Sequence, residues 1–161
     1  MAAVICNAKN PLKDHRILIL DGKNNEVKRI NNLSLVQKMV VVGQSKALFI
    51  QGRDRHGLIN LSDGTVAWTQ PGNVRLISPS GASLSPDGSL LFLLLADWDG
   101  RSKPAYSWRL QSLEATDGQV LSVMDMPKPM AGTRANLFGK IDADKVEIIT
   151  DTEQLSISIS R

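Results

Sequence analysis

One short pattern recurs along the chain at nearly regular intervals, and this repetition restricts the possible folds more than any other feature. Residues 45–50 (SKALFI) are similar to residues 88–93 (GSLLFL), which follow 43 positions later. A third copy, residues 144–149 (DKVEII), follows 56 positions after the second. Each copy begins with a polar or turn-forming residue and continues with apolar residues, the pattern of a turn that leads into a β-strand. A chain built from such units is expected to repeat one small sheet several times.

A second pattern runs in phase with the first. Residues 61–66 (LSDGTV) are similar to residues 115–120 (ATDGQV), and the Asp-Gly pair at residues 21–22 precedes the pair at Asp63 by 42 positions. Each Asp-Gly pair lies between two strand-like runs, as a hairpin turn does. The longer interval between the later copies is explained by residues 97–105, which are rich in Gly, Pro, Ser and charge and are predicted to form a loop insertion.

Short apolar runs separated by Gly, Pro, Asp and Asn predict an all-β chain. Leu155, Ile157 and Ile159 alternate with serines, which is the period of a half-buried strand. No stretch keeps a helical apolar period over several turns, and residues 31–38 are the only short helical candidate. Fourteen strands are predicted, at residues 3–6, 16–20, 26–30, 36–42, 47–51, 57–61, 65–69, 74–78, 90–95, 106–111, 119–124, 136–141, 145–150 and 154–160.

The period and the strand count together predict a partial β-propeller. Repeats of ~40–45 residues with about four strands each are typical of propeller blades, and a closed ring needs about four to eight blades. Fourteen strands make about three and a half blades, so the chain is predicted to hold about three to four antiparallel four-stranded blades without closing a usual ring. We expect one domain over residues 1–161, with blades near residues 1–30, 36–70, 74–125 and 134–160.

Residues 84–123 carry the motifs of one such blade. The segment reads LSPDGSLLF at residues 84–92, WRL at residues 108–110 and TDGQVL at residues 116–121. It resembles the blades of WD-repeat and bacterial YVTN-type β-propellers, in which an SPDG turn opens the second strand and a TGxV-like turn joins the third strand to the fourth. The match is good over this segment, fair over residues 45–68 and poor elsewhere. The chain has no Gly-His dipeptide at the blade starts and no Trp-Asp dipeptide at the ends of the third strands, where the WD family has them, so the resemblance implies the blade architecture rather than one family.

Composition and cysteine content limit the class of protein. The chain has 161 residues, of which 42% are hydrophobic and 22% charged, as in a globular domain with its own core. Cys6 is the single cysteine, which excludes an intramolecular disulfide and a cysteine-based zinc site. Residues 1–10 do not have the pattern of a signal peptide, and the longest apolar run, residues 90–96, is far shorter than the ~20 residues that cross a bilayer. We expect a cytoplasmic protein without a membrane segment.

A cationic connection at residues 52–57 (GRDRHG) is the first candidate partner-binding segment. Arg53 and Arg55 could hold an acidic partner or a phosphate group, with His56 beside them. The alternative is a charged hairpin that discourages pairing between sheet edges.

The loop insertion contains the second candidate. Trp98 is flanked by Asp97 and Asp99, and tryptophan is enriched among the residues that dominate protein interfaces. Two acids before a glycine also match the start of a calcium-binding loop, but Arg101 and Lys103 occupy the positions where further oxygen ligands are needed. We therefore predict no metal site. Trp98 either anchors a partner or folds back over the blade edge.

No catalytic residue and no cofactor site is predicted. His15 and His56 are the only histidines and have no second ligand at a usable spacing, so both are predicted to be exposed loop side chains. The chain has no phosphate loop, dinucleotide motif, nucleophile elbow or haem motif. The aromatic residues predicted to occupy equivalent core positions in the strands are Trp68, Trp108, Phe49 and Phe92.

Charge is distributed unevenly along the chain. Residues 1–60 hold ten Lys and Arg against four Asp and Glu, whereas residues 61–161 hold nine against twelve. The resulting net charges of +6 and −3 would attract two copies of the chain head to tail. The basic residues are scattered and have no aromatic neighbours for base stacking, so nucleic acid is not an expected partner.

The sequence thus predicts a non-enzymatic protein-interaction or scaffold module. Its open sheet edges would be completed by a partner protein or by a second copy in a head-to-tail homo-oligomer, with about seven blades in the two-copy ring. Two alternatives stay open. The chain is part of a propeller enzyme or cofactor-binding subunit whose site needs a second chain, or it is a fragment of a longer propeller.

Overall fold

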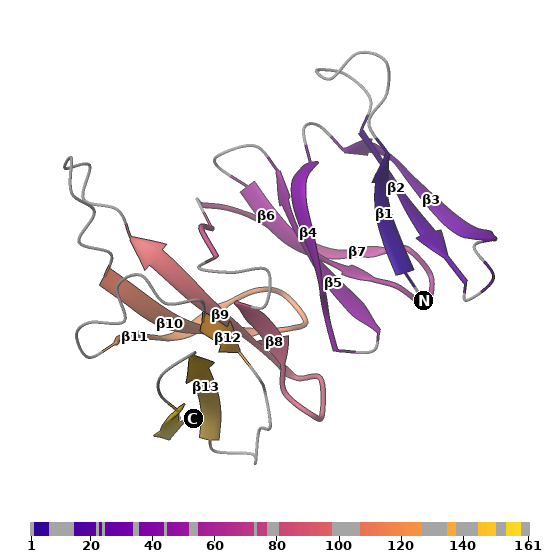
Figure 1. Ribbon diagram of the computed structural model, residues 1–161. Helices are drawn as coiled ribbons and strands as arrows, with labels where there is room; N and C mark the ends of the chain where they lie inside the picture. The colour runs from indigo at the N-terminus through magenta and orange to yellow at the C-terminus, as the bar shows by residue number, and fades with distance from the viewer. Residues whose placement is uncertain are drawn as a thin grey trace. The chain divides into compact units, whose positions relative to one another are not determined.

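Apolar runs and short glycine-containing turns fold the chain into antiparallel β-strands. The computed structural model (Figure 1) describes residues 2–6, 15–21, 23, 25–33, 36–43, 45–51, 55–72, 74–76, 81–97, 107–126, 135–137, 145–150 and 154–158. These residues form fourteen strands and no helix. The strands are β1 (Ala2–Cys6), β2 (His15–Leu20), β3 (Glu26–Leu33), β4 (Val36–Val42), β5 (Lys46–Gln51), β6 (Arg55–Asn60), β7 (Val66–Pro71), β8 (Ala82–Leu84), β9 (Leu90–Asp97), β10 (Ser107–Glu114), β11 (Val120–Asp125), β12 (Ala135–Leu137), β13 (Lys145–Thr150) and β14 (Gln154–Ser158).

The strands make four antiparallel sheets in which neighbours along the chain are neighbours in the sheet. The chain divides into two compact units, Met1–Val74 and Arg75–Arg161. The first unit contains the sheets β1-β2-β3 and β4-β5-β6-β7, and the second contains β8-β9-β10-β11 and β12-β13-β14 (Figure 1). The prediction of an all-β chain with four-stranded sheets is confirmed. The helical candidate at residues 31–38 is wrong, because β3 extends to Leu33 and β4 begins at Val36.

In the first unit the two sheets pack face to face. Ile17 and Ile19 of β2 are fully buried, and because residues two apart in a strand share a face, both point to the same side of their sheet. Ile17 packs with Val36 and Ile59, and Ile19 packs with Ala47, all from the neighbouring sheet. This interface is what joins the two sheets into one unit.

In the second unit β9 is buried on both faces. Its even-numbered residues, 90 to 94, pack with Val146 and Ile148 of β13. Its odd-numbered residues, 91 to 95, lie on the opposite face and are also buried. A strand that is covered on both sides has no polar face, which explains why this segment is a continuous apolar run rather than an alternating one.

The SPDG turn between β8 and β9 is held by its own side chains. The Ser85 N–H donates to the Leu90 carbonyl at 2.8 Å, and the Leu90 N–H donates to Ser85 Oγ at 2.9 Å. The Asp87 carboxylate accepts hydrogen bonds from the Ser85 hydroxyl and from the N–H and hydroxyl of Ser89. Gly88 has a φ of 72°, a left-handed conformation that glycine adopts without the steric cost of a side chain.

This turn is one residue longer than its counterpart in the preceding sheet. The hydrogen-bonded pair of Ser85 and Leu90 encloses four residues, whereas the pair of Val42 and Lys46 between β4 and β5 encloses three. Side chains alternate between the two faces of a strand. If two repeats are aligned at one fixed spacing, an extra residue in the turn of one repeat therefore pairs every later residue with one on the opposite face of the sheet.

Hydrogen bonds beyond the two turns give the true spacing of the repeat. The Leu61 N–H donates to the Ser45 carbonyl at 2.7 Å, and the Ala115 N–H donates to the Ser89 carbonyl at 2.8 Å. Ser45 and Ser89 are therefore equivalent, and they lie 44 positions apart rather than the predicted 43.

The predicted aromatic core is confirmed in part. Trp68, Trp108 and Phe92 are buried, and the side chain of Phe49 lies outside those that the structure describes. Their equivalence is wrong. Trp68 belongs to β7 and Trp108 to β10, and at the corrected spacing Phe92 corresponds to Leu48.

The strand predicted at residues 74–78 is also misplaced. Leu76 forms a single bridge with Leu95, and the strand that begins this sheet is β8, which has three residues. The centre of β8 is the polar Ser83. This short strand therefore has no apolar run of the kind by which strands were predicted from the sequence.

Candidate interaction surface

The cationic segment predicted to bind a partner continues from the end of β5 into β6. Gln51 at the end of β5 pairs with Arg55 at the start of β6, so residues 52–54 connect the two strands. Arg55 is exposed, whereas Arg53 lies outside the described residues. An exposed arginine at the start of a strand can contact an acidic group, so Arg55 stays a candidate partner contact.

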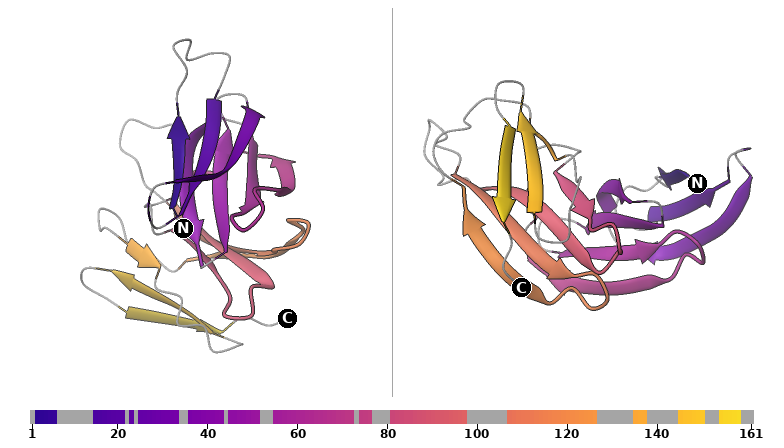
Figure 2. Two further views of the ribbon diagram at one scale, coloured as in Figure 1. Left: turned by 90° about the vertical axis from the view of Figure 1, so that its right-hand side faces the viewer. Right: turned by 90° about the horizontal axis from the view of Figure 1, so that it is seen from below.

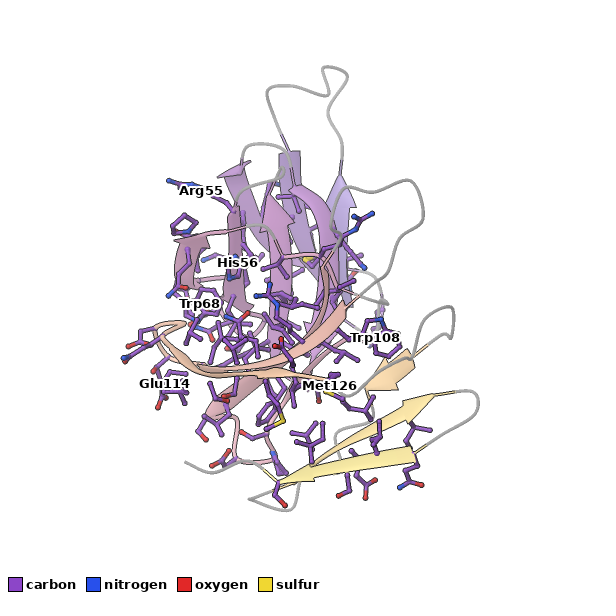
Figure 3. The ribbon with its side chains drawn as sticks, turned by 90° about the vertical axis from the view of Figure 1, so that its left-hand side faces the viewer. Arg55, His56, Trp68, Trp108, Glu114 and Met126 are labelled. Atoms are coloured by element: carbon purple, nitrogen blue, oxygen red, sulfur yellow. The ribbon has the colours of Figure 1, made fainter. Side chains whose placement is uncertain are left out.

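His56, the next residue of β6, is not the exposed loop histidine that was predicted. Its side chain is only 6% exposed, and its ring meets Trp68 of β7 edge-on, with ring centroids 5.7 Å apart (Figure 3). Its Nδ1 lies 3.3 Å from the carbonyl oxygen of Gly72. Burial lowers the pKa of His56 because it penalises the charged ring, and the Gly72 carbonyl opposes this effect in part. We therefore assign His56 to the packing of its sheet.

Burial of His56 predicts that the protein loses stability as the solution is acidified from neutral pH. The pKa of His56 lies below 6.5 in the folded chain, so the unfolded chain takes up the proton at a higher pH than the folded chain does. The stabilising contribution is complete above the unfolded pKa and is lost as the pH falls towards the folded one. One proton changes the free energy of unfolding by at most about 1.4 kcal/mol per pH unit. Chemical denaturation at several pH values between neutrality and about pH 5 measures this slope.

One variant of each histidine provides the matched comparison for this measurement. His56→Leu should flatten the slope over this pH range, because leucine takes up no proton. His15→Gln should keep the slope that His56 causes. A His56→Leu protein with the slope of the wild type would contradict the prediction.

The second predicted segment follows β9. Asp97 is the last residue of β9 and pairs with Ser107 at the start of β10. The insertion therefore lies between the second and third strands of its sheet. Trp98 and Asp99 lie outside the described residues, and the partner role of all three residues stays a prediction.

The strand predicted at residues 119–124 is β11, the last strand of the third sheet, and the exposure of its apolar side chains was not predicted. Four residues of β11, namely Val120, Leu121, Val123 and Met124, are 41–54% exposed. Among the described strands β11 pairs with β10 alone, so no described strand lies on its other side, which we call its open side. We call residues 120–125 the β11 edge. The feature of the sequence that could have indicated this edge is the absence of charge from the first five residues of the last strand of the sheet, residues 120–124.

The last sheet has a second open edge, at β14. Three residues, 151–153, connect β13 to β14, as residues 52–54 connect β5 to β6. The sheet therefore corresponds to the first three strands of β4-β5-β6-β7, and no described strand lies beyond β14 in the position of β7 (Figure 2). Leu155 and Ile157 pack on the core while Ser156 and Ser158 are exposed, which confirms the predicted alternation over these residues, and Ile159 lies outside the described residues.

The described residues offer no metal centre. In these ranges no three His, Cys, Asp or Glu side chains gather as metal ligands do. The same part of the chain has no helix that is long and apolar enough to cross a membrane.

Comparison with known proteins identifies the fold. No family model matches the chain, and no curated protein matches it significantly. The structure of BamB from Moraxella catarrhalis matches with a TM-score of 0.61 at 12% identity, over 98% of this chain and 48% of that one. An Hsv2 variant, KlHsv2 with loop 6CD replaced by a Gly-Ser linker, matches with a TM-score of 0.62 at 11% identity, over 90% and 48%. The C-terminal WD40 domain of Sif2 matches with a TM-score of 0.54 at 11% identity, over 99% and 43%.

These structures are WD40 and related β-propeller proteins, and the chain is accordingly a partial β-propeller. The resemblance inferred from residues 84–123 is confirmed. At 11–12% identity the likeness concerns the fold and says nothing of activity. The chain spans about half the length of each of these structures, at 43–48%.

Proposed function

We propose that the chain is a non-enzymatic protein-interaction module, in which both units belong to one partial β-propeller domain that strands from outside this sequence complete. The observation that supports this most directly is the open side of β14. A strand edge with unpaired N–H and C=O groups readily pairs with another chain. The two complete sheets have β7 and β11 in the corresponding position, so the strand we expect beside β14 is antiparallel to it.

The structural neighbours support an interaction module by analogy. They include a WD40 domain, and propellers of this general kind commonly bind other proteins. Fold analogy alone does not determine function, so the proposal depends on the open edge more than on the neighbours.

A second copy of the chain is one source of the missing strands. The first 60 residues carry a net charge of +6 and the remainder −3, which favours head-to-tail contact between copies. The ring of about seven blades from two copies stays a prediction, and seven lies within the range of about four to eight blades that closed propellers have.

Light scattering coupled to size exclusion tests the proposal, on the full chain at low and high salt. We expect a mass at least twice the 17.6 kDa of one chain, falling at high salt if the opposite charges contribute. Ser156→Lys places a charge on exposed β14 and should weaken the association, whereas Thr69→Lys on exposed β7 should not. A compact monomer at both salts and at high protein concentration would contradict completion by a second copy.

Two further measurements separate the alternatives. A propeller enzyme or cofactor-binding subunit would contain a stoichiometric metal or a visible chromophore after purification, and the interaction module would contain neither. An antibody against the chain would detect a band well above 17.6 kDa in its source cells if the chain is part of a longer propeller.

A further inference from the structure

We propose that the β11 edge accepts an extended segment of a partner protein, apolar in its centre and basic at both ends. This inference rests on the interaction function proposed above and names a surface for it that is separate from β14. The added segment would extend the sheet β8-β9-β10-β11 by one strand.

The backbone of β11 is available for such pairing. The Met126 N–H donates to the Trp108 carbonyl at 2.8 Å, so residue 126 directs its backbone towards β10. Along a strand, successive residues direct their N–H and C=O groups to opposite neighbours. Met124 therefore also faces β10, whereas Val123 and Asp125 direct these groups to the open side. They are the groups that bind an added strand.

The two other strands that end a sheet after an Asp-Gly pair, β3 and β7, are protected, and β11 is not. β3 exposes Lys28 and an ion pair between Arg29 and Glu26 at 2.7 Å. β7 ends in Pro71, which has no N–H to donate. Charges and proline on an edge strand prevent pairing with other chains. Residues 120–124 contain neither.

The exposed apolar side chains of β11 favour a partner segment that is apolar in its centre. Met124 lies opposite Leu110 and Val123 lies opposite Gln111, so neighbouring residues of β11 point to opposite faces of the sheet. Both are more than 40% exposed, at 41% for Met124 and 54% for Val123. A strand added beside β11 would place alternate side chains over both faces, and apolar ones would cover these residues.

Carboxylates at both ends of the strand determine the chemistry of the partner's ends. Asp117 lies in the turn before β11 and Asp125 is its last residue, and both are exposed. The Gln119 N–H donates to the Asp117 carboxylate at 2.8 Å and so holds it in the turn. A strand of six residues is about 20 Å long, so a segment of about six to eight residues reaches both ends. Lysine or arginine there would be attracted, whereas a second copy of β11 would bring further carboxylates.

The test uses the full chain and a labelled synthetic peptide, Lys-Val-Thr-Val-Thr-Val-Lys with blocked ends, read by fluorescence anisotropy. A matched peptide has glutamate in place of both lysines. At low salt the lysine peptide should bind at least about threefold to fivefold more tightly than the glutamate peptide, and high salt should reduce the difference. Equal binding of the two peptides at low salt would overturn the proposal.

A variant of the backbone tests whether the segment pairs as a strand. Val123→Pro removes one outward N–H without removing a hydrogen bond to β10, and should weaken binding of the lysine peptide about tenfold. Thr69→Pro is the matched control, because Thr69 has the same place in β7, 54 positions earlier. It should bind the peptide as the wild type does. Unchanged binding by a folded Val123→Pro protein would overturn the proposal.

Two further readings complete the experiment. If Val123→Pro fails to fold, Asp125→Lys is used in its place. It should weaken binding of the lysine peptide and strengthen binding of the glutamate peptide. An unchanged preference between the two peptides would overturn the proposal. A dimer of the wild type that Val123→Pro dissociates would show that a second copy occupies the edge, which also overturns it. Association through β14 is read with Ser156→Lys, so each of the two proposals can fail without the other.

Discussion

Replacing Leu93 with aspartate should destabilise the protein by about 4 kcal/mol or more, because it buries a carboxylate without a partner. Leu93 is fully buried in β9, and residues 91 and 95 on the same face are buried leucines. In such surroundings the charged form cannot be hydrated, so the variant either keeps an unpaired charge or folds with a protonated acid. The melting temperature should fall by roughly 10 °C, measured by circular dichroism.

Two variants separate the contributions to this effect. Leu93→Ala leaves a cavity without a charge and should cost about 2–5 kcal/mol. Val123→Asp places the same charge on a residue that is 54% exposed, where surface substitutions usually change stability by no more than about 0.5 kcal/mol. If Leu93→Asp melted within about two degrees of the wild type, β9 could not be the buried strand of its sheet.

Replacing Gly64 with alanine should cost about 3 kcal/mol, for two reasons that add. Gly64 has a φ of 69°, which costs a residue with a side chain about 1–2 kcal/mol. A Cβ at this position would also overlap Cγ of Lys28 and lie 3.4 Å from Cδ1 of Ile19. Since Cγ is the inner part of the lysine side chain, the β6–β7 turn or β3 has to move. Urea denaturation measures the loss.

Gly88 provides the control for this prediction. Its φ of 72° is nearly the same, but no described atom lies within 4 Å of a Cβ placed there. Gly88→Ala should therefore cost only the conformational term of about 1–2 kcal/mol. The difference between the two alanine variants measures the contact of the β6–β7 turn with the first sheet. Equal losses would show that this contact does not restrict the turn.

Features that depend on a few neighbouring residues could be predicted from the sequence. The apolar run of β9 and the alternation of Leu155 and Ile157 identify strands, and the Asp-Gly pairs at residues 63 and 117 identify hairpin turns. Both turns have left-handed glycines, at Gly64 and Gly118. The all-β class and the blade architecture follow from these local signals and their period.

Features that depend on register could not be predicted. The spacing of 43 residues aligned Phe49 with Phe92, and the fourth enclosed residue of the SPDG turn makes the true spacing 44. β9 is buried on both faces and has no polar face to fix its register. Its apolar run therefore aligns with the apolar run of β5 almost equally well at a spacing of 43 or 44 residues.

The candidate site was the least predictable part. His56 lies in the segment 52–57 that the sequence predicts as a connection between two strands, yet it is the second residue of β6 and is buried against Trp68. The β11 edge was missed for the opposite reason. An apolar strand is normally core, and only the position of β11 as the last strand of its sheet exposes it.

The order of strands within each sheet has a consequence for how the chain folds. Every sheet joins consecutive strands, and the connections within a sheet are three to nine residues long. Each pairing therefore closes a short loop, which costs little chain entropy and favours rapid folding compared with sheets of distant strands. During synthesis a sheet can form as soon as its own strands have left the ribosome, without waiting for the rest of the chain.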